Sequence, residues 1–310
     1  MNFIDILFPV LAIALTGFFV AKRGWLNKQE CASIAKFAFH YAIPILLFLS
    51  TSRAKFPPDM NFAFLASYYI GAVVIFLLAL FLARLILNYD ARQQSVIGMG
   101  AAYSNSTIVG VPVCLQALGQ DGLLPLFIIV SIHNLVMFSM GTFAAERDTA
   151  SGSFLKHLIH LVKQLLTSPI TFSLIAGLIV NFSGLEFYPP VEKAIEFFSE
   201  AAVPMALFAL GTTLTGYRIA GQLLPSIIMS VLKIVVMPAL VWLLAFKVFT
   251  LPVLWASAAV IASAMPVGVS AYVFAQRIEE CEPQVAASIV ISTIASLGTI
   301  SVVLMALPLH

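Results

Sequence analysis

"GAAYSNSTIVGVPVCLQALG", residues 100–119, is the stretch that decides the fold. It carries no charge, which suits a bilayer, yet its middle holds four consecutive polar residues (104–107) followed by Gly110 and Pro112. Proline removes a backbone donor and clashes with the preceding turn, and short polar side chains compete with helical hydrogen bonds. The stretch therefore predicts a membrane helix that is interrupted near its centre.

The composition places this stretch in a polytopic membrane protein. Hydrophobic residues make up 61% of the chain and charged residues 10%, whereas a soluble domain has about a quarter charged residues. The net charge of +2 argues against nucleic acid as a partner. Three cysteines, in no CxxC pattern, favour neither a disulfide framework nor a metal site, and no HExxH motif occurs. We expect no enzyme and no cofactor.

Charges and turn residues divide the chain into ten apolar segments that approach the roughly 20 residues of a spanning helix. The first segment lacks a basic start and is interpreted as a retained helix rather than a signal peptide. The segments are 3–21, 31–52, 62–87, 93–118, 122–144, 169–183, 192–214, 222–247, 252–276 and 284–307.

Basic residues indicate the orientation of these segments. The loops after odd-numbered segments hold ten Lys and Arg residues and those after even-numbered segments hold four, which places the odd loops in the cytoplasm and both termini outside. The longest loop, residues 146–168, carries an amphipathic pattern typical of an interfacial helix on the cytoplasmic leaflet. We expect a multi-pass protein of the plasma membrane, the inner membrane of a bacterium.

The chain repeats itself at an offset of 160 residues. Matching residues occur in two segment pairs: Pro9 and Pro169, Gly17 and Gly177, Gly24 and Gly184, Pro44 and Pro204, and Phe48 and Phe208. Residues 1–145 and 169–310 therefore form two five-helix repeats. Because five is odd, the second repeat is inverted in the membrane, which is a common plan of secondary transporters.

The second repeat contains its own interrupted segment, in which Pro266 follows Pro112 by 154 residues. Two broken helices that cross would bring four half-helix ends together; the N-terminal ends attract an anion and the C-terminal carbonyls attract a cation. The alternative is that both prolines merely kink their helices. The residues of the predicted substrate site here are Asn105, Ser106, Thr107, Gly110, Pro112, Pro266, Val267 and Gly268.

Both interrupted segments carry a family resemblance. "SNSTIVGVPV" resembles the fourth-helix motif of the auxin efflux carrier family, and "AMPVGVSAYVFAQR" resembles its ninth-helix motif. The resemblance implies a ten-helix inverted-repeat fold with crossed helices four and nine. It also implies a dimer-forming scaffold of helices 1, 2, 6 and 7, with elevator-type motion of helices 3–5 and 8–10. Bacterial members include malonate and malate permeases. Ser104, Val267 and Ala271 depart from the motifs, so auxin specificity is not carried over.

Other polar residues fall within apolar segments. Lys233 lies midway along the eighth segment, where a charge is costly and marks a function. It either pairs with substrate or donates to the carbonyls of a broken helix, and we favour the second role. His40 and Glu200, related by the offset of 160, are candidates for proton relay or for scaffold contacts. His133 and Asn134, in the fifth segment, are candidates for lining the substrate cavity.

The sequence thus predicts a secondary transporter for a small organic anion, a mono- or dicarboxylate. No Asp or Glu falls at the centre of a segment, which argues against sodium/proton antiport and leaves uniport or coupling to Na⁺ or H⁺. The partners are a carboxylate, the bilayer and a second copy in a homodimer. Three alternatives stay open: a sodium-coupled symporter of the bile-acid type, a polytopic membrane enzyme, and a membrane sensor that binds ligand without moving it.

Overall fold

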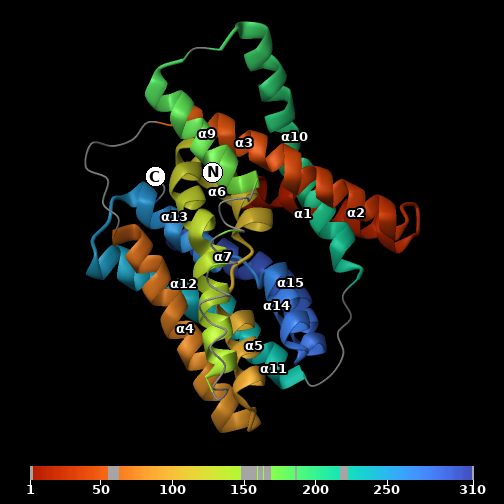
Figure 1. Cartoon of the computed structure of the whole chain (residues 1–310), viewed down its shortest axis with the longest axis vertical. Coiled ribbons are helices and arrows are strands. Elements are labelled where there is room, and N and C mark those ends of the chain that lie inside the picture. The colour runs from red at the N-terminus through yellow and green to blue at the C-terminus, as the bar shows by residue number, and fades with distance from the viewer. Residues whose placement is uncertain are drawn as a thin grey trace.

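The computed structural model describes residues 3–54, 63–147, 159, 163, 169–185, 187–216 and 223–308, and for residues 3–7, 10 and 11 the backbone alone. All regular elements of this described part are helices (Figure 1). Its sole β-type pairing is one isolated bridge, between Ser104 and Val267. Most of the predicted linker with its interfacial helix, residues 146–168, lies outside the described residues.

The helices follow one another with few long connections. The elements up to residue 147 are α1 (Phe3–Lys22), α2 (Lys28–Phe37), η1 (Ala38–Ala42), α3 (Ile43–Ser52), α4 (Ala63–Leu87), α5 (Ala91–Ala102), η2 (Ser106–Gly110), α6 (Val111–Leu118), η3 (Gln120–Gly122) and α7 (Leu123–Glu146). Those after it are α9 (Pro169–Ser183), α10 (Pro189–Leu214), α11 (Leu223–Val231), η4 (Leu232–Val236), α12 (Met237–Leu243), η5 (Leu244–Val248), α13 (Val253–Ala264), α14 (Val269–Ile278) and α15 (Glu282–Ala306).

Six helical runs of the described chain are long and apolar enough to cross a membrane. They are 28–52, 63–87, 120–146, 189–214, 223–248 and 282–306, and four shorter apolar helices cover 12–22, 106–118, 169–183 and 253–264. Two of the short helices are short because the chain is interrupted beside them. The protein is therefore a helical membrane protein with several apolar helices, and the count of ten spans stays a prediction.

The first predicted interruption lies near the centre of its stretch, but Pro112 does not form it. Pro112 lies in the first turn of α6, which continues from η2 without interruption; the break lies earlier, at residues 103–105. Each of Pro44, Pro112 and Pro238 follows by two residues a five-residue π-helical turn (η1, η2 and η4). A proline has no N–H to donate to the preceding turn. The wider turn shifts the backbone hydrogen-bond register before it, so the helix continues.

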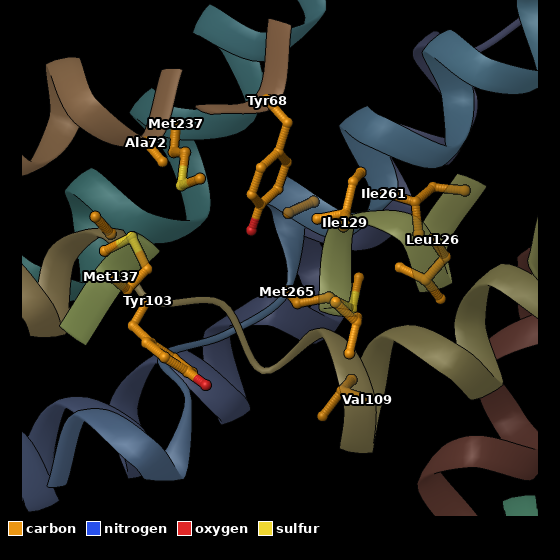
Figure 2. Packing of buried hydrophobic residues seen from close by; sticks show 14 of the residues in the cluster. Tyr68, Ala72, Tyr103, Val109, Leu126, Ile129, Met137, Met237, Ile261 and Met265 are labelled. Atoms are coloured by element: carbon orange, nitrogen blue, oxygen red, sulfur yellow. The ribbon is translucent and has the colours of Figure 1, made fainter. Parts of the chain in front are cut away.

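Figure 1 shows two helix groups. The first group is α1, α2, α3, α9 and α10, and the second is α4, α5, α7 and α11–α15. Contacts within each group agree with this division: α1 and α3 pack on α10, α3 packs on α9, and α5 packs on α4 and α7. Most of the buried apolar core lies in the second group, where Tyr68 of α4, Ile129 of α7 and Ile261 of α13 are close together (Figure 2).

Glycines set the closest helix contacts of the first group. A Cβ at Gly17 of α1 would lie 2.2 Å from the carbonyl oxygen of Phe208 in α10, and one at Gly177 of α9 would lie 2.7 Å from that of Phe48 in α3. Small residues of this kind let membrane helices approach backbone to backbone. Gly17 precedes Gly177 by 160 residues, and Phe48 precedes Phe208 by the same number, so the two helix pairs pack alike.

We expect Gly17→Ala to destabilise the protein by about 1–3 kcal/mol. The added methyl group would overlap the backbone carbonyl of Phe208, which, unlike a side chain, cannot rotate out of the way. Thermal unfolding of the detergent-purified protein measures the effect. Gly298→Ala is the matched control, since a Cβ at Gly298 meets no atom within 4 Å. Equal midpoints for Gly17→Ala and Gly298→Ala would contradict the packing described.

Candidate functional site

Two short non-helical segments, residues 103–105 after α5 and 265–268 after α13, pair with each other; we call this point the crossing. The N–H of Asn105 donates to the carbonyl of Pro266 at 2.9 Å, and the N–H of Gly268 donates to the carbonyl of Tyr103 at 3.0 Å. The chain between Tyr103 and Val109 runs beside Met265 in Figure 2. Backbone groups that a bilayer would leave unpaired are thereby satisfied by the other break.

Side chains from three surrounding elements hold the crossing in place. The hydroxyl of Tyr68 in α4 bonds to Ser104 Oγ at 3.0 Å. Lys233 in η4 donates from Nζ to the carbonyl of Ser263. Ser292 Oγ of α15 accepts the N–H of Val267 at 3.0 Å. Tyr68 and Ser292 were missed by the sequence analysis, because a lone hydroxyl in an apolar helix looks the same whether it bonds its own helix or a distant backbone group.

A cavity of about 900 Å³ opens beside the crossing, and we call it the central cavity. Its walls come from the crossing and η2, from the middle of α7, from the start of α9, from one face of α14 and from His40. Six predicted site residues line it: His40, Asn105, Ser106, Thr107, His133 and Asn134.

The other predicted site residues are not among those that line the central cavity. Pro266, Val267 and Gly268 form the crossing behind it, and Val267 is fully buried. A Cβ at Gly268 would lie 2.5 Å from the ring of Tyr103, so glycine here permits close approach of the two strands. Gly110 packs beside Met265, and Pro112 lies in the first turn of α6.

Two residues that line the central cavity have a buried donor without a hydrogen-bond partner among the described residues: Asn105 at Nδ2 and His133 at Nδ1. Asn105 is 4% exposed and His133 is 3% exposed. His133 Nε2 accepts the N–H of Ser104 at 3.2 Å, which leaves the hydrogen of a neutral ring on Nδ1. An unpaired buried donor is costly, so both atoms point to a ligand that accepts hydrogen bonds.

The helix that begins at Ser106 adds to this positive character. The first N–H groups of a helix have no partner within it and carry the positive end of the helix dipole. Ser106, Thr107 and Ile108 of this first turn line the central cavity. Helix α14 also begins at the crossing, with Val269 and Ser270 in the lining, so two helix N-termini meet here.

Arg277 is a lining residue that the sequence analysis used only for orientation. It lies in the last turn of α14, and Ser270, Val273 and Arg277 all line the central cavity. Their spacing of three and four residues places them on one helix face, which is the signal that could have identified Arg277. No Asp or Glu belongs to the lining within the described chain, so the charge that the cavity offers is positive.

Asn134 and Tyr103 form a side wall of the central cavity. The Tyr103 hydroxyl donates to Asn134 Oδ1, and the rings of Tyr103 and His133 lie 4.5 Å apart between centroids. The pair therefore orients Asn134 beside His133.

The remaining candidates lie apart from these donors. His40 is exposed, and it lines both the central cavity and an apolar groove of about 560 Å³ between α3, α9 and α10. Glu200 is exposed on α10 and lines neither space. Lys233 is 0% exposed; it bonds to Ser263 in the last turn of α13, just before the crossing, and is not among the residues that line the central cavity. Within the described residues, no group of three or more His, Cys, Asp or Glu side chains is placed to hold a metal ion.

Comparison with known proteins matches the chain to a family of transporters. Residues 3–304 match the family model described as "Membrane transport protein". A protein of Rhizobium meliloti named "Putative malonate transporter" is 25% identical over 94% of this chain and 92% of its own length. "Auxin efflux carrier component 8" of Arabidopsis thaliana is 23% identical over 87% of each chain. The "Lysosomal cholesterol signaling protein" of Mus musculus is 26% identical over 68% of this chain and 26% of its own.

We expect Ser292→Ala to lower stability by about 1–3 kcal/mol, because the buried N–H of Val267 loses its acceptor. Thermal unfolding in detergent measures the loss. Ser301→Ala is the matched control on the same helix, since the Ser301 hydroxyl donates only within α15, to the carbonyl of Leu297. Equal midpoints for the two variants would show that Ser292 does not support the crossing.

Proposed function

The chain belongs to the membrane transport protein family that includes the auxin efflux carriers, and we propose that it carries a small organic anion, a mono- or dicarboxylate, across the membrane. It is a transporter and not an enzyme. The anion is our proposal, as are the route and the motion described below.

The observation that carries the proposal is the pair of unpaired donors, Asn105 Nδ2 and His133 Nδ1, at the wall of the central cavity. A carboxylate has two oxygens that together accept several hydrogen bonds. It would take both donors and face the N-terminus of the helix that begins at Ser106, where negative charge is stabilised. Arg277 at the end of α14 would attract the anion toward this position.

A second cavity supports movement of the anion rather than binding alone. This cavity, of about 490 Å³, is lined by residues that include Ser50, Arg53, Gln120 and Leu124. In the helical run from Lys28 to Ser52, His40 borders the central cavity and Ser50 borders the second one, about 15 Å farther along the axis. In α7, Leu124 borders the second cavity and His133 borders the central cavity. Cavities at two heights of the same helices are what alternating access requires.

The proposed architecture is ten membrane helices in two inverted five-helix repeats, 1–145 and 169–310. The offset of 160 in the sequence and the paired contacts of Gly17 and Gly177 support it. The first helix group then acts as the scaffold and the second as the moving domain in an elevator-type transition. A bacterial inner-membrane location with both termini outside, and a homodimer formed through the scaffold, complete the proposal.

We expect the purified protein in liposomes to take up radiolabelled malonate, malate or a monocarboxylate, and Asn105→Ala to lower this uptake about tenfold or more. The reason is that the variant removes a donor to a charged ligand, which contributes about 1.5–3 kcal/mol. The measurement is the initial uptake rate, with protein content of the liposomes held equal.

Asn27→Ala is the control, because Asn27 is an exposed helix cap at α2 and lies outside the central cavity. Transport by Asn105→Ala at the rate of Asn27→Ala would contradict the site. Saturable carboxylate binding without any uptake would instead identify a sensor, and uptake that requires sodium would identify a sodium-coupled symporter.

A further inference from the structure

Lys233 is a buried cation that the proposed route does not use. It lies in the π-helical turn η4 and is among the largest side chains with no exposed surface. Of the buried side chains that the structure describes, it is the one lysine or arginine, and Asp and Glu do not occur among them. Its charge is therefore balanced by dipoles and not by a carboxylate of the described chain.

The dipole that faces Lys233 is the C-terminal end of α13. The ammonium group donates to the carbonyl of Ser263, and α13 ends at Ala264, where Met265 becomes extended. The last carbonyls of a helix have no partner within it and carry the negative end of the helix dipole. The neighbouring carbonyl, of Ala262, accepts a hydrogen bond from Ser106 Oγ at 3.2 Å.

Carbonyl and hydroxyl oxygens at the C-terminal end of a broken helix are the ligands that hold a coupling sodium ion in other transporter folds. Here the place is taken by an ammonium group that belongs to the chain. Two cations cannot share one carbonyl end at hydrogen-bond distance, because like charges repel strongly in a site with few counter-charges.

The geometry points to Lys233 as a tethered counter-cation: it fills the position of a coupling ion at the end of α13, so that substrate binding needs no sodium, and its truncation opens a site for one. This inference rests on the proposed transport function. Lys233 is a positioning residue here, since it bonds to the end of α13 that leads into the crossing and is not among the residues that line the central cavity.

The test compares purified wild-type protein, Lys233→Ala and Lys247→Ala in NaCl, KCl and choline chloride at equal ionic strength. Lys247 is a matched control because it is exposed in the same helical run and its ammonium lies over the ring of Trp242. We expect the thermal midpoints of wild type and Lys247→Ala to be equal in the three salts. The midpoint of Lys233→Ala should rise with NaCl concentration, as binding of an ion to the folded state requires.

Carboxylate uptake in liposomes gives the second measurement. Wild-type uptake should be the same in NaCl and choline chloride, whereas Lys233→Ala should lose about tenfold or more in choline chloride and regain part of it in NaCl. Lys233→Arg, which keeps the charge, should stay independent of sodium. If no carboxylate is transported by wild type, the proposed function fails, and the thermal midpoints still decide the role of Lys233.

Three results would overturn the inference. The first is stabilisation of the wild-type protein by NaCl over choline chloride. The second is a folded Lys233→Ala whose midpoint is the same in all three salts. The third is a Lys233→Ala variant that cannot be purified in folded form in either NaCl or choline chloride, which would make Lys233 a purely structural donor.

Discussion

The structure depends on one constraint: backbone groups exposed by a broken helix cannot remain unpaired inside a bilayer. Two breaks meet at the crossing and satisfy each other, Asn105 with Pro266 and Gly268 with Tyr103. Since that pairing needs close strands, glycine at 268 and the buried hydroxyls of Tyr68 and Ser292 follow from it. The central cavity lies where two helices begin, at Ser106 and at Val269, instead of continuing through the crossing.

Some of the fold and site could be predicted from the sequence, because proline, glycine and asparagine are conspicuous in apolar segments. Asn105 and the paired interruptions stood out in this way, and the structure places Asn105 at the crossing and in the lining of the central cavity. The first break was predicted near the centre of residues 100–119 and lies at residues 103–105; Pro112 is not its cause, because a π-helical turn lets the chain pass Pro112 as a helix. Proline alone does not reveal such a turn, since Pro204 lies inside α10 without one.

Other parts could not be predicted because they depend on which helices become neighbours. Arg277 looked like an ordinary loop charge until α14 was placed beside α7 and η2. Lys233 was conspicuous, but its partner at Ser263 follows only from the packing of η4 on α13. These residues show that the sequence identifies polar groups in apolar segments that need a hydrogen-bond partner. Packing determines which of them line the cavity and which support the backbone.

The crossing also has a consequence for biogenesis. The N–H of Asn105 finds its acceptor at Pro266, which is 266 − 105 = 161 residues later in the chain. At a synthesis rate of about 5–20 residues per second, the first half waits roughly 10–30 seconds with an open break before its partner emerges. During that time the break needs temporary cover from the insertion machinery or from water. The two halves therefore cannot mature independently, and a chain that stops before residue 266 leaves a half-built helix for quality control to remove.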